Sequence, residues 1–278
     1  MADISAAHDL SGRVALLTGA AGMLGRQYTR TLLAAGAKVV AADLQADQVG
    51  RAAATAQAEV GGEAIAWPVD VRHKAEVDAM VADVVGRWGR IDILINNAAI
   101  DPKFDAGVAG QQSNTFEDFP LELWQQSLDV NLTGAFLCSQ AVGKVMVRQR
   151  RGVMVNISST YGVVAPDQRL YRQAGESDQE QTLFKPAPYA VTKAGIAHLT
   201  RYLAAYWGNL GIRVNTLTPG GVFNSQDDDF VERYSARTPL GRMAHQDEMN
   251  GALLFLVSDA STYMTGANLV VDGGWTTW

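Results

Sequence analysis

Seven short apolar runs, separated by stretches of helical character, are the feature that most constrains how this chain can fold. The runs lie at 14–18, 39–43, 64–69, 91–96, 153–158, 212–218 and 268–271. Helical patterns occupy 22–35, 45–60, 74–88, 121–148, 189–208 and 248–258. Unbroken apolar strands that alternate with helices indicate a parallel sheet covered on both faces. Right-handed crossovers then predict a doubly wound α/β sheet of about seven strands flanked by helices.

The alternation runs through the whole chain without a break that would separate two domains. The length of 278 residues favours about two domains if each has about 150 residues. However, no internal repeat, low-complexity tract or linker interrupts the pattern, so we predict a single domain over 1–278. Two polar stretches, 101–120 and 161–188, do not fit the alternation. Loops of such length are usually lids, binding loops or insertions.

Composition argues against several classes of function. The chain has 23 basic and 29 acidic residues, a net charge of −6, which disfavours nucleic acid and anionic membranes as partners. The one cysteine, Cys138, excludes an intramolecular disulfide and a multi-cysteine metal site, and the four histidines lack metal-ligand spacing. The longest uncharged stretch, 152–166, is too short and polar to span a bilayer. We expect a cytoplasmic protein without a bound metal, since the N-terminus also lacks a secretory signal.

A glycine-rich loop, residues 18–25, follows the first predicted strand and opens the first helix. Glycines in such a loop permit a tight turn and let the backbone approach a pyrophosphate, whose charge the helix N-terminus attracts. The loop therefore predicts a Rossmann-type dinucleotide site at Gly19, Gly22, Met23, Leu24 and Gly25. A glycine-rich turn without any ligand is the alternative when the motif is taken alone.

The second predicted strand ends in Asp43, and this residue bears on the choice of cofactor. A carboxylate there can accept hydrogen bonds from an adenosine ribose diol and would repel a 2′-phosphate. The next residues, Leu44 and Gln45, offer no cation that could offset that repulsion, although Arg26 and Lys38 are near in sequence. We therefore expect NAD rather than NADP. The alternative role of Asp43 is that of a helix N-cap.

Tyr189 and Lys193 lie four residues apart, and so on one face of a predicted helix. A tyrosine is a poor base at neutral pH because its pKa is about 10. A neighbouring ammonium favours the phenolate, so we expect Lys193 to lower the pKa of Tyr189. A hydroxyl from Ser158 or Ser159, at the end of the fifth strand, would steady a substrate oxygen.

Taken together, these residues resemble the short-chain dehydrogenase/reductase family, in its short-subunit branch, over nearly the whole chain. Further matching motifs are Asn96–Ala99, Asn131, Asn156–Ser159, Arg213–Asn215 and 269–274. The resemblance implies that dinucleotide contacts extend to Leu44, Asp70, Val71, Asn97, Ala98, Ala99, Tyr189, Lys193, Pro219, Gly220, Val222 and Asn224. It also implies a homotetramer (or homodimer), and we expect Trp275 and Trp278 to pack at a subunit interface or a neighbouring active site.

The resemblance implies that hydride passes between an alcohol or carbonyl carbon and C4 of the nicotinamide. Tyr189 would transfer the proton, and Ser159, the second serine of its pair, would bind the substrate oxygen. Lys193 would lower the tyrosine pKa and bind the nicotinamide ribose. Asn131 would hold water in a relay to solvent. The implied catalytic set is thus Asn131, Ser159, Tyr189 and Lys193.

The glycine spacing departs from that branch, because Met23 stands at its middle glycine and Gly22 comes one residue earlier. As written, Gly19-x-x-Gly22-x-x-Gly25 is similar to the longer-subunit branch, which includes sugar-nucleotide epimerases and dehydratases. A sugar-nucleotide-modifying enzyme that retains its NAD is therefore a second hypothesis. A non-catalytic dinucleotide sensor is a third, although a sensor would not need the proton-relay residues.

A second departure is an insertion at about 165–188, because Ser159 and Tyr189 are 30 residues apart, farther than is usual in the family. By position it should lie over the substrate cleft, and it carries the polar residues Arg169, Tyr171, Arg172, Glu176, Asp178 and Lys185. Such a set suits a sugar, polyol or sugar acid better than a hydrophobic alcohol or ketone. Members linked to bacterial sugar metabolism show a similar combination. The predicted substrate contacts are Ser159, Tyr161, Arg169, Tyr171, Arg172 and Gly221. The alternative is a surface flap that serves oligomer contacts.

Overall fold

A parallel sheet forms the centre of the molecule. The computed structural model describes residues 6–102, 115–172, 176–177 and 180–278. Within that part of the chain, seven strands pair in the order β3-β2-β1-β4-β5-β6-β7. Their bounds are Val14–Thr18 (β1), Lys38–Asp43 (β2), Ala64–Pro68 (β3), Ile93–Asn96 (β4), Gly152–Ile157 (β5), Ile212–Pro219 (β6) and Asn268–Val271 (β7). The prediction of a doubly wound parallel sheet is confirmed.

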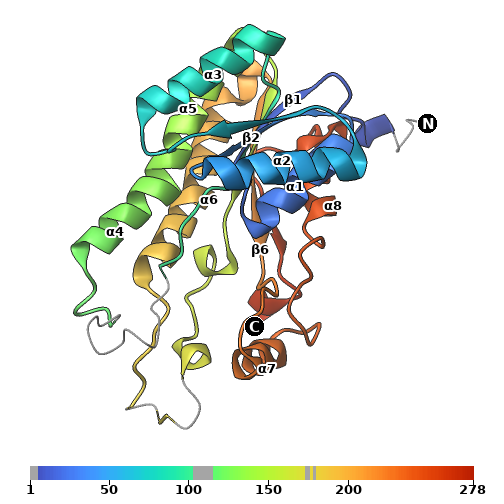
Figure 1. Cartoon of the computed structure of the whole chain (residues 1–278). Coiled ribbons are helices and arrows are strands. Elements are labelled where there is room, and N and C mark those ends of the chain that lie inside the picture. Colours follow the sequence, from blue (N-terminus) through green and yellow to red (C-terminus); the bar gives the residue numbers. More distant parts are fainter. Residues whose placement is uncertain (1–5, 103–114, 173–175, 178–179) are drawn as a thin grey trace.

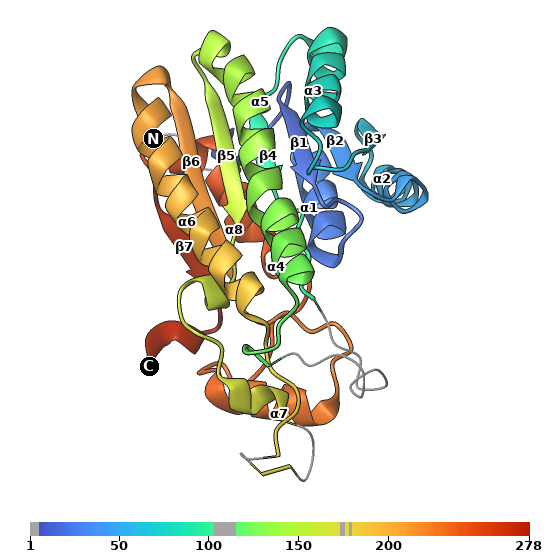
Figure 2. The ribbon, with the colours of Figure 1, turned by 90° about the vertical axis from the view of Figure 1, so that its left-hand side faces the viewer.

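Helices cover both faces of the sheet, as Figures 1 and 2 show. One face carries Met23–Ala34 (α1), Ala46–Val60 (α2) and Asn250–Val257 (α8). The other carries Lys74–Trp88 (α3), Ala135–Gln149 (α5) and Ala187–Trp207 (α6). The strands feed both cores, since Ala15 and Leu17 of β1 join the first cluster while Val14 and Leu16 join the second. This two-sided burial explains why every residue of β1 had to be apolar or small.

The predicted long helix at 121–148 contains an irregular turn that its apolar pattern does not reveal. Leu121–Leu128 (α4) and α5 are joined by a π-helical segment, Asp129–Gly134. By length and composition Leu121–Gln149 could cross a membrane, but 56% of its most apolar window is buried inside the protein. It packs on the sheet as a core helix (Figure 2). Wider π turns are often found at functional sites.

The carboxyl ends of the central strands meet at one edge of the sheet. The order reverses between β1 and β4, where open α/β sheets bind ligands. Beyond that edge, the short 3-10 helix Gln168–Tyr171 packs against Asp228–Arg237 (α7), and Figure 2 shows both below the strands. Asp227 caps α7 by accepting a hydrogen bond from the Phe230 N–H at 2.8 Å. These elements enclose the candidate site from the side opposite the sheet.

Candidate active site

The loop after β1 is joined to the loop after β4 by short polar contacts. The Thr18 hydroxyl accepts hydrogen bonds from the backbone N–H groups of Asn97 and Ala98, both at 3.1 Å. The Asn97 amide donates to the carbonyls of Thr18 and Gly19 at 3.1 and 3.0 Å. Gly19 has a φ of +67°, and a Cβ there would lie 2.7 Å from the Ala98 Cα. Only glycine fits this position without displacing the neighbouring backbone.

The start of α1 forms a cradle that suits a pyrophosphate. Gly22 is its N-cap and provides no side-chain cap, and the first turn holds no acidic residue. The first N–H groups of such a helix lack partners within the helix, so they are available to a phosphate. Gly22 is exposed, whereas a Cβ on Gly25 would clash with the Gly19 carbonyl and lie 2.7 Å from the Ala20 Cα. The predicted dinucleotide group thus fits the residues present.

Asp43 contacts this cradle with one carboxylate oxygen and, more weakly, the Gln45 N–H at 3.4 Å with the other. Its Oδ2 accepts a hydrogen bond from the Ala21 N–H at 3.0 Å. The interpretation of Asp43 as a helix N-cap is wrong, because α2 begins at Ala46 with Gln45 as its N-cap. Arg26 donates to the Ala21 carbonyl at 2.6 Å, so a cation also lies beside this turn. Lys38 lies at the opposite end of β2 and pairs with Glu63 at 2.9 Å.

Two of the residues predicted to contact the dinucleotide, Asp70 and Val71, have structural partners of their own. Asp70 accepts hydrogen bonds from the Arg72 guanidinium, with Nη2 at 2.6 Å, and this contact lowers the pKa of the Asp70 carboxyl. Val71 is buried and packs closely on Gly134 of the π-helical segment, where a Cβ would lie 2.7 Å from the Val71 Cγ2. Leu44, by contrast, is 62% exposed beside Asp43. Of these predicted contacts, Leu44 is thus the one whose side chain is exposed next to the cradle.

A cavity of about 340 Å³ brings the predicted chemistry together at the ends of β5 and β6. Fourteen predicted site residues line it: Met23, Leu24, Asn97, Ala99, Ser159, Tyr161, Tyr171, Tyr189, Lys193, Pro219, Gly220, Gly221, Val222 and Asn224. The predicted catalytic residues Ser159, Tyr189 and Lys193 thus share one cavity with residues predicted to hold a dinucleotide. This juxtaposition allows proton transfer at the position where a hydride acceptor would be bound.

The two adjacent serines have different partners, which separates their roles. The Ser158 hydroxyl is buried and donates to the Lys193 carbonyl at 2.8 Å, so it anchors β5 to α6. The Ser159 hydroxyl accepts a hydrogen bond from the Tyr161 N–H at 3.2 Å and also interacts with Tyr189. Ser159 is therefore the serine available to a substrate oxygen.

Burial dominates the titration of Tyr189 and Lys193. It raises the pKa of Tyr189 to about 12, with a further increase from the Asp101 carboxylate, while the Ser159 hydrogen bond acts in the opposite direction. Burial also lowers the pKa of Lys193 to about 8, against the effect of Asp101. The pKa of Tyr189 is therefore raised overall, and the expectation that Lys193 lowers it stays a prediction. The Lys193 ammonium donates to the Ile157 carbonyl at 2.8 Å and lies 5.8 Å from the Tyr189 ring centroid.

Asn131 lies in the π-helical segment and connects two walls of the site rather than lining the cavity. Its Oδ1 accepts from the Ile100 N–H at 2.8 Å, and its Nδ2 donates to the Ile100 carbonyl at 2.9 Å. The same Nδ2 donates to the Thr192 hydroxyl at 3.1 Å, one residue before Lys193. The side chain is thus fully engaged in positioning these segments. A water relay at Asn131 stays a prediction. Because both polar atoms of the side chain already have partners, the backbone N–H and carbonyl of Asn131 are its remaining polar groups.

The insertion places its predicted substrate residues in two different environments. Tyr161, just before it, and Tyr171 line the cavity and share a hydrogen bond of 2.9 Å between their hydroxyls. Arg169 lies outside the cavity, with a 72% exposed side chain paired to Asp167 at 2.9 Å. Arg172 also lies outside it, and its carbonyl accepts from Arg233 at 3.0 Å. Residues 173–175 and 178–179, which include Asp178, lie outside the described residues.

Lys185, one of the polar residues expected over the cleft, also lines the cavity. Several further cavity residues have no local signal in the sequence. They are Asp101, Thr160, Gln226, Phe230, Tyr234 and Met243. Tyr234 accepts a hydrogen bond from the Gly221 N–H at 2.6 Å and stacks on Trp275 at 4.2 Å between ring centroids. Trp275 is therefore buried within its own chain, which corrects the expectation of an interface. Trp278 is 77% exposed, and its contact with another subunit stays a prediction.

Comparison with known proteins agrees with this arrangement. The sequence profile of the short chain dehydrogenase family matches residues 13–171, and a profile described as enoyl-(acyl carrier protein) reductase matches residues 176–276. The D-threitol dehydrogenase of Mycolicibacterium smegmatis is 34% identical over 275 residues, which cover 96% of this chain and 94% of that protein. The 3-alpha-(or 20-beta)-hydroxysteroid dehydrogenase of Mycobacterium tuberculosis is 37% identical over 265 residues, 95% of this chain and 90% of that protein.

A solved structure is similar over the whole length. The gluconate 5-dehydrogenase from Burkholderia cenocepacia, in complex with NADP and tartrate, superposes with a TM-score of 0.85 at 32% identity. The match covers 99% of this chain and 100% of that one.

Proposed function

Because this chain belongs to the short-chain dehydrogenase family, we propose that it is an NAD-dependent oxidoreductase that interconverts a secondary alcohol (or hemiacetal) and a carbonyl. We further propose that its substrate is a sugar, a polyol or a sugar acid. The observation that carries the proposal is that Ser159, Tyr189 and Lys193 line one cavity beside the glycine cradle. A non-catalytic sensor would not need these three side chains at one point.

Each catalytic residue has a distinct task in this scheme. A nicotinamide, when bound, supplies or accepts the hydride. The Ser159 hydroxyl donates a hydrogen bond to the substrate oxygen, and Tyr189 transfers the proton at its phenol oxygen. With a pKa raised to about 12, Tyr189 is protonated at neutral pH and can act as the acid that protonates a carbonyl oxygen. Alcohol oxidation requires the phenolate, which a cation close to the ring would stabilise.

The preference for NAD rests on Asp43. Its carboxylate is held against the glycine loop by Ala21, at the end of β2 where a ribose would be bound. A 2′-phosphate placed there would be repelled by that charge, although Arg26 on the neighbouring carbonyl acts in the opposite direction. NADP is bound by the gluconate 5-dehydrogenase relative. A direct comparison of the two cofactors with the wild type tests this proposal, and a preference for NADP would contradict it.

The substrate class rests on the polar lining of the cavity. Hydroxyls of Ser159, Tyr161 and Tyr171 line it together with the charged side chains of Asp101 and Lys185. Two relatives are named for threitol and gluconate, which are rich in hydroxyl groups, whereas a third is named for hydroxysteroids. A hydrophobic alcohol or ketone is therefore a second candidate substrate. A sugar-nucleotide-modifying enzyme with retained NAD is favoured only by the spacing of Gly22.

We also propose a homotetramer or homodimer. Support comes from the outer face of α6, where Tyr202 and Tyr206 are 61% and 63% exposed and stack on each other at 6.0 Å. Exposed neighbouring aromatic residues favour contact with another protein surface.

Substitution of the proton-transfer residue tests the proposed chemistry. We expect Tyr189→Phe to lower kcat by about 10²- to 10⁴-fold, the usual contribution of a general acid or base. Binding of NADH should change little, because only a hydroxyl is removed. Turnover can be followed by NADH absorbance over a panel of polyols, sugars, sugar acids and hydrophobic alcohols, and NADH binding by fluorescence. Rates close to those of the wild type would overturn the mechanism.

A further inference from the structure

An ion pair that crosses the mouth of the active-site cavity is not explained by proton or hydride transfer. Lys185, from the insertion, pairs with Asp101, from the loop after β4, and both line the cavity. The Lys185 side chain is 11% exposed and that of Asp101 is 32% exposed. The Lys185 ammonium lies 4.4 Å from the centroid of the Tyr189 ring, and within 6 Å of the rings of Tyr161 and Tyr171. The pair is therefore at the surface on which a substrate must rest.

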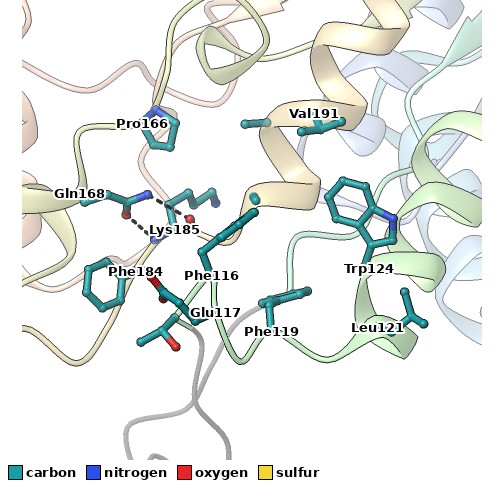
Figure 3. Close-up of a pocket in the computed structure, with 13 residues that line it drawn as sticks. Phe116, Glu117, Phe119, Leu121, Trp124, Pro166, Gln168, Phe184, Lys185 and Val191 are labelled. Atoms are coloured by element: carbon teal, nitrogen blue, oxygen red, sulfur yellow. Dashed lines mark hydrogen bonds between the residues drawn. The ribbon is translucent and has the colours of Figure 1, made fainter.

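Each partner of the ion pair is held in place by a carboxamide that grips the nearby backbone at two points. Gln168 accepts from the Lys185 N–H at 2.7 Å and donates to the Lys185 carbonyl at 3.2 Å, the two bonds drawn in Figure 3. Asn131 makes the equivalent two bonds to Ile100, the residue before Asp101. Such clamps limit the freedom of both charged residues. The geometry is therefore that of a preorganised site, in contrast to an incidental surface pair.

The pair presents a donor and an acceptor side by side. The Lys185 ammonium can donate three hydrogen bonds and cannot accept any. Asp101 uses Oδ2 toward Lys185, while its Oδ1 is buried and has no hydrogen-bond partner among the described residues. A buried carboxylate oxygen without a donor is costly, so a ligand that supplies an O–H group there is favoured.

We propose that Lys185 and Asp101 select a substrate that carries a hydroxyl on the carbon next to the reacting carbinol, that is, a neutral vicinal diol or polyol. A hydroxyl both accepts from Lys185 and donates to Asp101. A carboxylate in the same place has no proton for Asp101 and brings a second negative charge beside it. An alkyl group satisfies neither partner. This inference rests on the proposed function and narrows its substrate class from sugars and sugar acids to neutral polyols.

Three four-carbon probes isolate the group next to the carbinol: 2-butanol, 2,3-butanediol and 2-hydroxybutyrate. With the full-length wild type and its preferred nicotinamide, we expect kcat/KM for the diol to exceed that for either other probe by about 10- to 100-fold, typical of one or two charge-assisted hydrogen bonds. A wild type that prefers 2-hydroxybutyrate or 2-butanol, or that oxidises none of the three, would overturn the proposal.

Variants then assign the preference to the pair. Lys185→Met should reduce the advantage of the diol over 2-butanol to less than about threefold, mainly through a higher KM for the diol. The ratio of the two kcat/KM values is the readout, because any effect of Lys185 on Tyr189 itself acts on both probes alike. Lys185→Gln keeps a neutral hydrogen-bond donor of similar length, so its ratio of kcat/KM for the diol to that for 2-butanol should lie between those of the wild type and Lys185→Met. This graded response separates the loss of the donor from a folding defect. Asp101→Asn should raise kcat/KM for 2-hydroxybutyrate by about tenfold, because it removes the competing negative charge. An unchanged ratio of diol to mono-alcohol in Lys185→Met would overturn the proposal.

Two controls separate this inference from the proposed function. Lys74→Met removes an exposed lysine paired with Asp78 on α3, and should leave all three kcat/KM values unchanged. Tyr189→Phe tests the chemistry whichever probe is preferred. If Tyr189→Phe abolishes turnover while the wild type prefers the mono-alcohol or the hydroxy acid, the proposed function holds and the inference about the ion pair fails.

Discussion

Carboxamide side chains bridge segments on both walls of the active-site cavity, with Asn97 on the cofactor side, but the two walls differ in how closely their backbones approach. On the cofactor side, the loops after β1 and β4 approach so closely that a Cβ on Gly19 would lie 2.7 Å from the Ala98 Cα. On the substrate side, carboxamide side chains clamp distant segments together, Gln168 on Lys185 and Asn131 on Ile100. Backbone contact leaves no room for variation, whereas side-chain clamps can be exchanged one at a time. The cofactor wall is thus expected to tolerate substitution far less than the substrate wall.

The largest effect is expected from Gly25→Ala on the cofactor wall. A Cβ there would clash with the Gly19 carbonyl, which is backbone and cannot rotate away. We expect a loss of at least about 3 kcal/mol in the free energy of unfolding, together with weaker NADH binding. Denaturant unfolding and fluorescence titration measure both quantities.

Gly22→Ala is the matched control for this steric argument. Its Cβ would come no closer than 3.3 Å to the Gly19 carbonyl, and its φ of −68° suits any residue. We expect a change in the free energy of unfolding of about 1 kcal/mol or less, the scale of an N-cap exchange. Equal destabilisation of both variants would show that close backbone packing does not distinguish the two glycines.

A gain in stability is expected where the two walls meet, from Lys193→Met. Burial lowers the pKa of Lys193 from 10.5 to about 8, so the charged form is disfavoured in the folded protein. At pH 7 the variant should be more stable by about 1–3 kcal/mol, less the loss of the hydrogen bond to Ile157, while its turnover is abolished.

The stability difference between Lys193→Met and the wild type should depend on pH. Between pH 8 and 10.5 the unfolded wild type binds more protons than the folded one, so this lysine makes wild-type stability rise with pH. The advantage of Lys193→Met should therefore shrink across that window, and thermal unfolding of both proteins at pH 7 and pH 10 measures it. A variant less stable than the wild type at pH 7 would contradict the prediction that burial of the Lys193 ammonium lowers the free energy of unfolding.

The smallest effect is expected from Gln168→Leu on the substrate wall. The change removes both bonds of the clamp on Lys185 but leaves the ion pair with Asp101 in place. We expect KM for the best substrate to rise by about three- to tenfold with kcat nearly unchanged, because only the orientation of Lys185 is loosened. Steady-state kinetics measures KM and kcat separately.

Thr182→Val serves as the comparison for this clamp, since it lies in the same insertion and its hydroxyl donates to Glu176 at an exposed site. We expect its KM to match that of the wild type. Similar KM values for Gln168→Leu and the wild type would mean that the clamp does not position Lys185.

Much of the fold and the cofactor wall could be predicted from local pattern. The apolar runs predicted all seven strands to within two residues at either end, because burial on both faces leaves no other composition for them. The roles of Gly19 and Gly25 in the cradle were also predicted, because the glycine spacing that permits a close backbone approach lies within the eight residues 18–25. The π-helical turn at 129–134 escaped prediction because its apolar spacing is that of an ordinary helix.

The substrate wall escaped prediction for a different reason. Lys185 and Asp101 are 84 residues apart, and neither has a neighbour that marks it as part of a pair. Arg169 looked as suitable as Tyr171, yet one side chain points to solvent and the other lines the cavity. A polar loop has no period, so its sequence does not show which side chains face inward.

The sequence by itself determined the doubly wound sheet, the glycine cradle and the placement of Tyr189 and Lys193 on one helix face, the pair in our proposal for proton transfer. These follow from burial, turn geometry and spacing along a helix, all of which act over a few residues. Only the tertiary structure decided the titration of Tyr189, where burial raises the pKa, and the ion pair that lines the cavity. Desolvation and ion pairing depend on which distant segments meet, and that is settled when the chain folds.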